Sequence, residues 1–134
     1  EARAAVAAML AVTDIALPSF DDEASLWGDP SPAATVARYL AKGVGEVVVK
    51  NGADAVAYHA VGQGGTVATP PVTDIRDTTG AGDAFNAGYL SARLMGRKPP
   101  QAIAVGQSLS ATVLRHPGAR APKALVRGMS AILS

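Results

Sequence analysis

The residues with the clearest capacity for chemistry stand in one stretch, RDTTGAGDAFNAGYLSARL, at positions 76–94. Two threonines and two glycines lie between two aspartates, and a helix-like run of Ala, Phe, Tyr and Leu follows at once. A helix N-terminus presents unpaired backbone N–H groups and roughly half a positive charge. Gly80, Ala81 and Gly82 leave those groups accessible, because almost no side chain stands in the way. The stretch therefore predicts a binding place for an anion such as phosphate.

A carboxylate beside that anion site adds a second capability. Asp83 falls in the first turn of the expected helix, where the helix dipole favours its ionised form. There it can accept the proton of a hydroxyl while that hydroxyl attacks phosphorus. Residue types alone leave a plain capping role equally open, because Thr, Gly and Asp are common at helix starts.

Two familiar nucleotide-binding motifs are missing. No Gly-Lys-Ser/Thr follows the glycines, so the stretch is not a P-loop. GVGEVV precedes an expected strand instead of following one, and GQGG is better explained as a turn, so neither is a dinucleotide fingerprint. A dinucleotide-dependent oxidoreductase is therefore ranked low.

The elements that must position this stretch alternate along the chain. Helices are expected over 1–10, 20–28, 31–43, 82–95, 98–114 and 122–134, and strands over 12–19 and 46–50. Residues 51–60 are expected to form a turn that leads into another strand, followed by a hairpin turn at 62–65 and a strand returning over 66–71. The helix over 98–114 is apolar nearly all round, so we expect it to be buried. This alternation predicts an α/β layered fold with a largely parallel central sheet flanked by helices. Ligands of such sheets bind beyond the carboxyl ends of the strands.

Composition excludes several classes of function. The chain has 134 residues, 49% of them hydrophobic, a net charge of +1 and no cysteine. It can bury a core, and its scattered basic residues give no support for binding to nucleic acid or a membrane. Without cysteine there is no disulfide, thiolate metal site or cysteine nucleophile, which fits a cytoplasmic location.

The opening stretch resembles the C-terminal signature of the ribokinase-like (pfkB) carbohydrate kinases, D-T-x-G-A-G-D-x-F, and matches every fixed position. The resemblance implies a ribokinase-like fold and an ATP-dependent sugar kinase. It implies that Asp83 is the catalytic base that deprotonates the sugar hydroxyl. It also implies that the backbone at Gly80, Ala81 and Gly82 forms the anion hole for the transferring γ-phosphate.

The same resemblance implies two kinds of metal ion. Asp77 and Thr79 match positions that often help to bind a monovalent cation such as K⁺ near the nucleotide. The family's N-x-x-E motif, which organises Mg²⁺ and phosphate, falls here on Ser19 and Asp22, and both depart from the pattern. Asp22 and Glu23 still offer acidic oxygens that suit Mg²⁺, although an acidic first turn of a helix explains them equally well.

Further positions match the surroundings of the nucleotide in this family. The residues implied to border it are Lys50, Asn51, Gly52, Ala53, Asn86 and Gly118. A plain turn at 50–53 and a solvated helix face at Asn86 remain open as explanations.

Local phrases narrow the resemblance to one subfamily. LPSFDDEASLWGD, GVGEVVVKNGADA and VLRHPGARAP look most like bacterial 2-keto-3-deoxygluconate kinases, which implies a small sugar acid as the acceptor of phosphate. A kinase for another sugar, such as ribose or fructose, and a non-catalytic nucleotide-binding fragment stay open as alternatives.

The resemblance covers only part of a kinase of this family. Residues 1–134 correspond to the C-terminal nucleotide-binding and catalytic part, and we expect the N-terminal part, with the lid and most sugar contacts, to be absent. Because a lid excludes water from the reaction, we expect these residues alone to be weakly active or inactive. The lid commonly mediates dimers in relatives, so any homo-oligomer is expected of the full-length protein.

Overall fold

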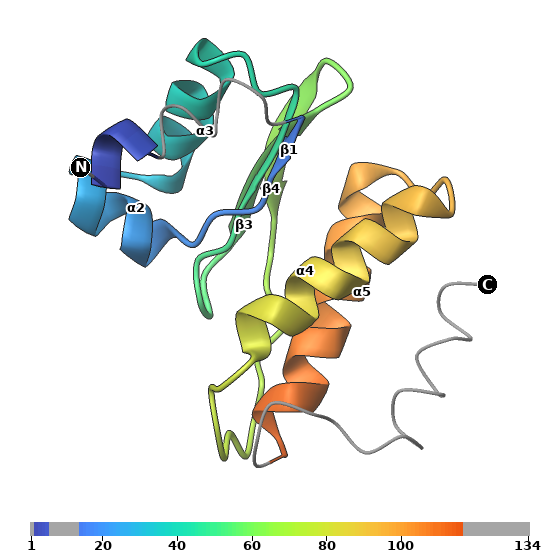
Figure 1. Cartoon of the computed structure of the whole chain (residues 1–134). Coiled ribbons are helices and arrows are strands. Elements are labelled where there is room, and N and C mark those ends of the chain that lie inside the picture. Colours follow the sequence, from blue (N-terminus) through green and yellow to red (C-terminus); the bar gives the residue numbers. More distant parts are fainter. Residues whose placement is uncertain (1, 6–13, 117–134) are drawn as a thin grey trace. The chain divides into compact units, whose positions relative to one another are not determined.

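A computed structural model describes residues 2–5 and 14–116 of the chain, and Figure 1 shows their elements. The chain forms two compact units, Glu1–Ala68 and Thr69–Ser134. The elements are β1 (Ile15–Ala16), α2 (Phe20–Trp27), α3 (Pro32–Ala41), β2 (Glu46–Val49), β3 (Val56–Ala60) and β4 (Gln63–Val67) in the first unit, and α4 (Ala81–Leu94) and α5 (Pro99–Leu114) in the second. Within the described ranges, no helix has both the length and the apolar character needed to cross a bilayer.

The first unit is built on a four-stranded sheet in the order β1-β2-β3-β4. β1 pairs with β2 in parallel, and the other two pairings are antiparallel. The predicted α/β architecture is confirmed, but the described sheet is mixed and not largely parallel. The reason lies in the connections, because short turns after β2 and β3 return the chain beside the strand it has just left, which produces antiparallel neighbours.

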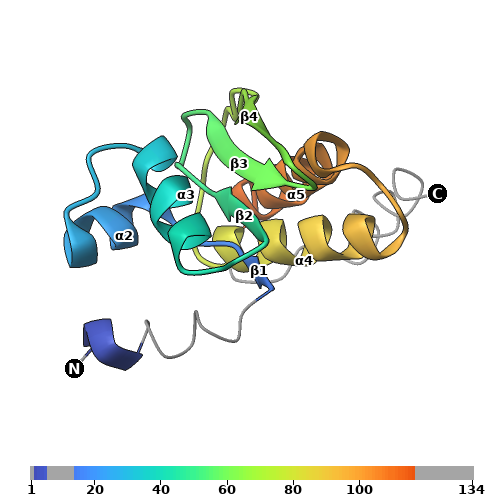
Figure 2. The same ribbon diagram turned by 90° about the horizontal axis from the view of Figure 1, so that it is seen from above.

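Helices α2 and α3 lie on one side of this sheet, as Figure 2 shows from above. The Ser31 hydroxyl accepts a hydrogen bond from the Ala34 N–H at 3.2 Å, and Pro32 occupies the first position of α3, so the predicted helix start is confirmed. The core beneath α3 consists of Ala16, Val36, Tyr39, Val44, Val47, Val49 and Ala57, with Phe20 and Leu40 partly buried against it. Among these residues, Phe20 is the one that α2 contributes.

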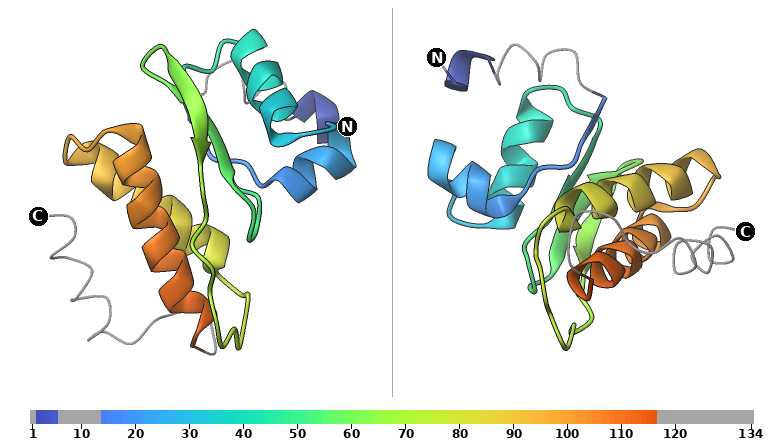
Figure 3. Two further views of the ribbon diagram at one scale, coloured as in Figure 1. Left: turned by 180° about the vertical axis from the view of Figure 1, so that it is seen from behind. Right: turned by 60° about the horizontal axis from the view of Figure 1, so that its bottom comes forward.

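In the second unit, α4 packs against α5, and both views of Figure 3 show the two helices side by side. Both were predicted close to their observed bounds. Ala102 and Ile103 on α5 are fully buried, whereas Gln101, Ala104 and Ser108 are exposed, so the burial expected for this apolar helix is confirmed for one face only. The helix predicted over 122–134 and the candidate residue Gly118 lie outside the described residues.

The turn between β3 and β4 differs from the prediction. Ala60 pairs with Gln63, so the turn consists of Val61 and Gly62, and the Gln63-Gly64-Gly65 segment belongs to β4. Both turn residues have positive φ, 54° at Val61 and 73° at Gly62. Two-residue hairpin turns need this left-handed backbone, which Gly adopts freely and a β-branched residue adopts only under strain.

We expect the substitution Val61→Asn to stabilise the protein by about 1 kcal/mol, because Asn tolerates the left-handed region that strains Val. The free energy of unfolding in urea measures this gain. Val61→Thr is the matched control, since it keeps the branched Cβ and should change stability by less than about 0.5 kcal/mol. Equal effects of the two substitutions would contradict backbone strain at this turn.

Candidate active site

The N-terminus of α4 has the geometry expected of an anion-binding helix start. Gly80 is the N-cap residue, with a left-handed φ of 79°. The first bond into the helix runs from the Ala84 N–H to the Gly80 carbonyl at 2.9 Å, and the Ala81 N–H donates to the Thr78 carbonyl at 3.3 Å. Among the described residues, no hydrogen bond is recorded for the N–H groups of Gly82 and Asp83. Two donors at the positive end of the helix dipole are thus available to an anion.

The loop before α4 is held in place by its own backbone and by α5. The Asp77 Oδ1 accepts a hydrogen bond from the Thr79 N–H at 2.9 Å, which closes a local turn. The N–H groups of Arg76 and Asp77 both donate to the Leu114 carbonyl at the end of α5, at 2.8 and 3.3 Å. The Asp77 carboxylate therefore has a demonstrable role in shaping the loop. Its predicted contact with a monovalent cation stays a prediction.

The side chains along the first turns of α4 differ in exposure. Asp83 is exposed, and Asn86, three residues further along, is partly buried. Residues three apart lie on the same face of a helix, so Asn86 and Asp83 are neighbours on α4. An exposed carboxylate beside free N–H groups is chemically suited to accept a proton next to a bound phosphate.

In the first unit, the carboxyl ends of β1 and β2 bring two predicted site positions together. Ser19 and Lys50 form a parallel bridge just beyond the two strands. The Lys50 N–H donates to the Pro18 carbonyl at 2.9 Å, and the Phe20 N–H donates to the Lys50 carbonyl at 2.8 Å. The parallel pairing therefore continues to the point where α2 begins. This is the edge at which ligands bind in α/β sheets.

The turn after β2 presents its backbone to solvent. The Asp54 N–H donates to the Asn51 carbonyl at 2.9 Å, and Gly52 has a left-handed φ of 58°. Gly52 and Ala53 are exposed, and Asn51 is partly buried. The turn predicted at 50–53 is confirmed as local structure, whereas its contact with a nucleotide stays a prediction.

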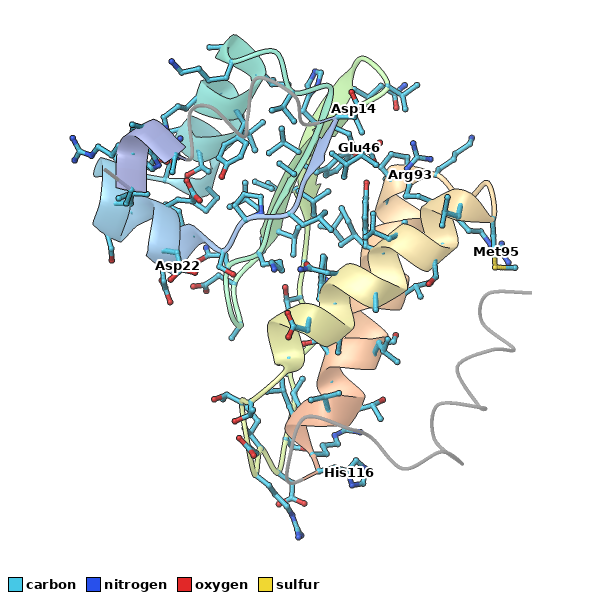
Figure 4. All side chains as sticks on the ribbon, in the orientation of Figure 1. Asp14, Asp22, Glu46, Arg93, Met95 and His116 are labelled. Atoms are coloured by element: carbon cyan, nitrogen blue, oxygen red, sulfur yellow. The ribbon has the colours of Figure 1, made fainter. Side chains whose placement is uncertain are left out.

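Asp22 and Glu23, the two neighbouring acids in the first turn of α2 that the sequence offers for Mg²⁺, differ in exposure and in their partners. Asp22 is exposed, and Figure 4 shows it on the side of α2 that faces away from α3. Glu23 is buried, and its Oε1 accepts a hydrogen bond from the Tyr39 hydroxyl at 2.9 Å. Its other oxygen pairs with Arg38. Both oxygens of Glu23 are therefore engaged by Tyr39 and Arg38, and Asp22 is the acid of this pair that a ligand can reach.

A charged cluster around Arg38 fastens α2 to α3. The Arg38 Nη2 lies 2.7 Å from the Asp29 Oδ2, and the guanidinium stacks 4.7 Å from the centre of the Trp27 ring. The side chains of Arg38, Glu23 and Asp29 are only 19%, 12% and 8% exposed. The hydrogen bond from Arg38 lowers the pKa of Asp29, against the opposing effect of burial. Burial, reinforced by the hydrogen bond to Glu23, raises the pKa of Tyr39.

Sequence reasoning missed this cluster. The available signal was the spacing of Thr35 and Arg38, which places both on one face of α3, with Asp29 just before the helix. The Thr35 hydroxyl donates to the Asp29 Oδ2 at 2.7 Å, so both residues do converge on that carboxylate. The described residues contain no group of three or more His, Cys, Asp or Glu side chains arranged to hold a metal ion.

Comparison with known proteins gives consistent matches. A model of the pfkB family of carbohydrate kinases matches residues 1–125. The 2-dehydro-3-deoxygluconokinase of Escherichia coli K12 is 42% identical over 119 residues, covering 86% of this chain and 38% of the relative. The 2-dehydro-3-deoxygluconokinase of Dickeya dadantii is 41% identical over 126 residues, covering 91% of this chain and 40% of the relative. The chain thus spans about two fifths of the length of these relatives.

Solved structures show the same fold. An E. coli protein described as ribokinase II, in complex with ATP and Mg²⁺, superposes with a TM-score of 0.79 at 27% identity, covering 98% of this chain and 42% of that one. A PfkB protein from Polaromonas sp. JS666 gives a TM-score of 0.77 at 30% identity, covering 92% of this chain and 39% of that one. The predicted ribokinase-like fold is therefore confirmed.

The Arg38 cluster makes stability depend on pH through Asp29. Because the folded pKa of Asp29 is lowered, its pairing contributes fully above the unfolded value of about 3.9 and is lost as the pH falls through the folded pKa. We expect Asp29→Asn to cost about 1–2 kcal/mol at pH 6 and less at pH 3, measured by urea unfolding.

Asp21→Asn is the matched control, because it makes the same chemical change at an exposed acid of α2. Its effect should stay within about 0.5 kcal/mol at both pH values. A cost of Asp29→Asn that is the same at pH 6 and pH 3 would contradict the assignment of the pH dependence to this pair.

Proposed function

Because the chain belongs to the pfkB family of carbohydrate kinases, we propose that it serves the ATP-dependent phosphorylation of 2-keto-3-deoxygluconate to its 6-phosphate. The observation that carries this proposal is the start of α4, where free N–H groups at Gly82 and Asp83 adjoin the exposed Asp83 carboxylate. The choice of sugar is supported by the relatives named 2-dehydro-3-deoxygluconokinase, which is another name for the kinase of this compound.

In the proposed reaction, the start of α4 binds the γ-phosphate of ATP. The backbone at Gly80, Ala81 and Gly82 is proposed as the anion hole, with the Gly82 N–H free within the described residues and the Ala81 N–H at 3.3 Å from the Thr78 carbonyl oxygen. The helix dipole stabilises the charge on the phosphoryl oxygens as the phosphoryl group passes between donor and acceptor. The left-handed Gly80 supports this role, since its backbone turn leaves the approach to the helix without a side chain.

Asp83 is proposed as the catalytic base. Its carboxylate takes the proton of the C6 hydroxyl while the hydroxyl oxygen forms a bond to the γ-phosphorus. The bond between the γ-phosphorus and the oxygen bridging to the β-phosphate breaks, and ADP leaves with that electron pair. The exposure of Asp83 supports this assignment, because a sugar hydroxyl can reach it.

Mg²⁺ and K⁺ are proposed as the metal ions of the site. Mg²⁺ would neutralise charge on the phosphates, and Asp22 suits it, because Mg²⁺ commonly takes one or two carboxylates together with phosphate oxygens and water. The exposed Asp22 carboxylate fits such a partial ligand set without a cluster of three protein ligands. Asp77 and Thr79 are proposed near the K⁺, with one oxygen of Asp77 already engaged by the Thr79 N–H.

The remaining proposed contacts border the nucleotide. They are Lys50, Asn51, Gly52, Ala53, Asn86 and Gly118. The exposed backbone of the turn after β2 supports the first four, because a turn without large side chains can approach a nucleotide closely. We further propose that residues 1–134 form the nucleotide-binding and catalytic part of the kinase.

A kinase for another sugar is the second candidate. It is favoured by the 30% identity over 119 residues to an ATP-dependent 6-phosphofructokinase of Thermoanaerobacterium thermosaccharolyticum. Phosphorylation of 2-keto-3-deoxygluconate, ribose and fructose by a chain that includes both parts of the kinase separates the two candidates. A preference for ribose or fructose would overturn the proposed substrate.

In a chain that includes both parts of the kinase, we expect Asp83→Asn to lower phosphoryl transfer by about 10²–10⁴-fold, because the amide cannot accept the hydroxyl proton. Formation of sugar phosphate from γ-labelled ATP measures turnover, and calorimetry should show ATP binding within about twofold of wild type. Asp74→Asn is the matched control, because Asp74 is an exposed acid of the preceding loop and has a positive φ of 59° that Asn tolerates. Retained turnover in Asp83→Asn would contradict the role of the base.

The 134 residues alone are expected to bind Mg·ATP and to phosphorylate the sugar weakly or not at all. The physical reason is that the lid and most sugar contacts are proposed to lie in the part of the relatives that this sequence does not match. Turnover is compared directly with that of a complete 2-dehydro-3-deoxygluconokinase. Equal turnover of the two proteins would contradict this division of roles.

A further inference from the structure

Helices α4 and α5 touch through their backbones at two glycines. A Cβ placed on Gly88 of α4 would lie 3.0 Å from the Gly106 Cα and 3.1 Å from the Val105 carbonyl oxygen. A Cβ placed on Gly106 of α5 would lie 2.9 Å from the Phe85 carbonyl oxygen. Carbon and oxygen atoms do not pack this closely, so a side chain at Gly106 would force one helix away from the other.

The Phe85 carbonyl oxygen, which lies closest to the position of an added Cβ on Gly106, belongs to the first turns of α4. Phe85 follows Asp83 by two residues, so its carbonyl moves with the peptide groups that carry the Gly82 and Asp83 N–H donors. The Phe85 ring also flanks Gly106, with ring carbons 3.0 and 3.1 Å from the position of an added Cβ. The ring is only 4% exposed and stacks on Tyr89 with a centroid distance of 6.4 Å, so it has little room to move aside.

Helix α5 also holds the loop on the other side of Gly80. Its Leu114 carbonyl accepts the N–H groups of Arg76 and Asp77. The Gln107 Nε2, next to Gly106, lies 3.3 Å from the Thr69 hydroxyl oxygen. The loop before the helix start and the turn after it are therefore both anchored to α5.

We propose that Gly106 is a positioning residue for the γ-phosphate site. Its missing Cβ lets α5 support the Phe85 carbonyl directly, and this contact fixes where the first turn of α4 stands relative to the loop at 76–79. Gly106 touches neither nucleotide nor sugar in this account, and it acts through α4. The inference rests on the proposed function, because it assumes that the start of α4 binds the γ-phosphate.

The test compares Gly106→Ala with Ala104→Gly. Ala104 is exposed on α5, so its substitution perturbs the helix without opening the crossing. In Gly106→Ala, the backbone amide resonances of Gly82 and Asp83 should move in nuclear magnetic resonance spectra recorded without ligand. The affinity for Mg·ATP should fall about tenfold or more while that for Mg·ADP stays within about twofold, because only ATP carries the γ-phosphate.

A second substitution separates the effect of the Phe85 carbonyl from the effect of the Phe85 ring. Phe85→Val removes both ring carbons nearest Gly106, Cδ2 and Cε2, and keeps the carbonyl, so the double variant Gly106→Ala/Phe85→Val should retain the loss in ATP affinity. If Gly106→Ala does not fold, Gly88→Ala replaces it, because its added Cβ makes slightly longer contacts at the same crossing.

The outcomes distinguish this inference from the function on which it rests. Amide resonances of Gly82 and Asp83 that match those of Ala104→Gly would overturn the positioning role, as would equal losses of ATP and ADP affinity. A wild-type protein that binds ATP no more tightly than ADP would instead contradict the proposed γ-phosphate site.

Discussion

The left-handed backbone at Gly80 is the constraint on which the candidate site depends. With φ at 79°, the chain turns into α4 without placing a side chain before the first turn, so the Gly82 and Asp83 N–H groups face outward without partners in the described part of the chain. Most other residue types would strain this backbone, with Asn and Asp the least affected. Catalysis of phosphoryl transfer relies mainly on fixed groups that stabilise charge, so the position of these donors matters more than their number.

Each unit holds its own candidate residues in place by a different kind of interaction. In the second unit, bare backbone contact at Gly88 and Gly106 holds α4 against α5. In the first unit, α2 adds Phe20 to the described core, and the partly buried charges of Glu23 and Arg38 tie it to α3. Buried ion pairs add little net stability but are costly to break singly, so they define one arrangement of α2 and thereby the direction of Asp22.

The sequence predicted what depends on local signals. The start and extent of α4 followed from glycines before an apolar run, and the cap of α3 followed from Ser31. The turn at Val61 was missed because several neighbouring glycines can adopt a left-handed backbone, and strand pairing alone decides which position turns. The spacing of Thr35 and Arg38 indicates their shared contact with Asp29. The pairing of Arg38 with Glu23 on α2 and the Gly106 crossing depend on tertiary packing, which residue spacing along one element does not encode.

The central claim is that the start of α4 binds the terminal phosphate of the nucleotide. Titration of the wild-type protein with Mg·ATP and with Mg·ADP, followed through the backbone amide resonances of Gly82 and Asp83, tests it most directly. We expect large, saturable downfield shifts of these two amides with ATP and small shifts with ADP, since only ATP places a γ-phosphate against these donors. Identical shifts with both nucleotides, or ATP binding that leaves both amides unmoved, would contradict it.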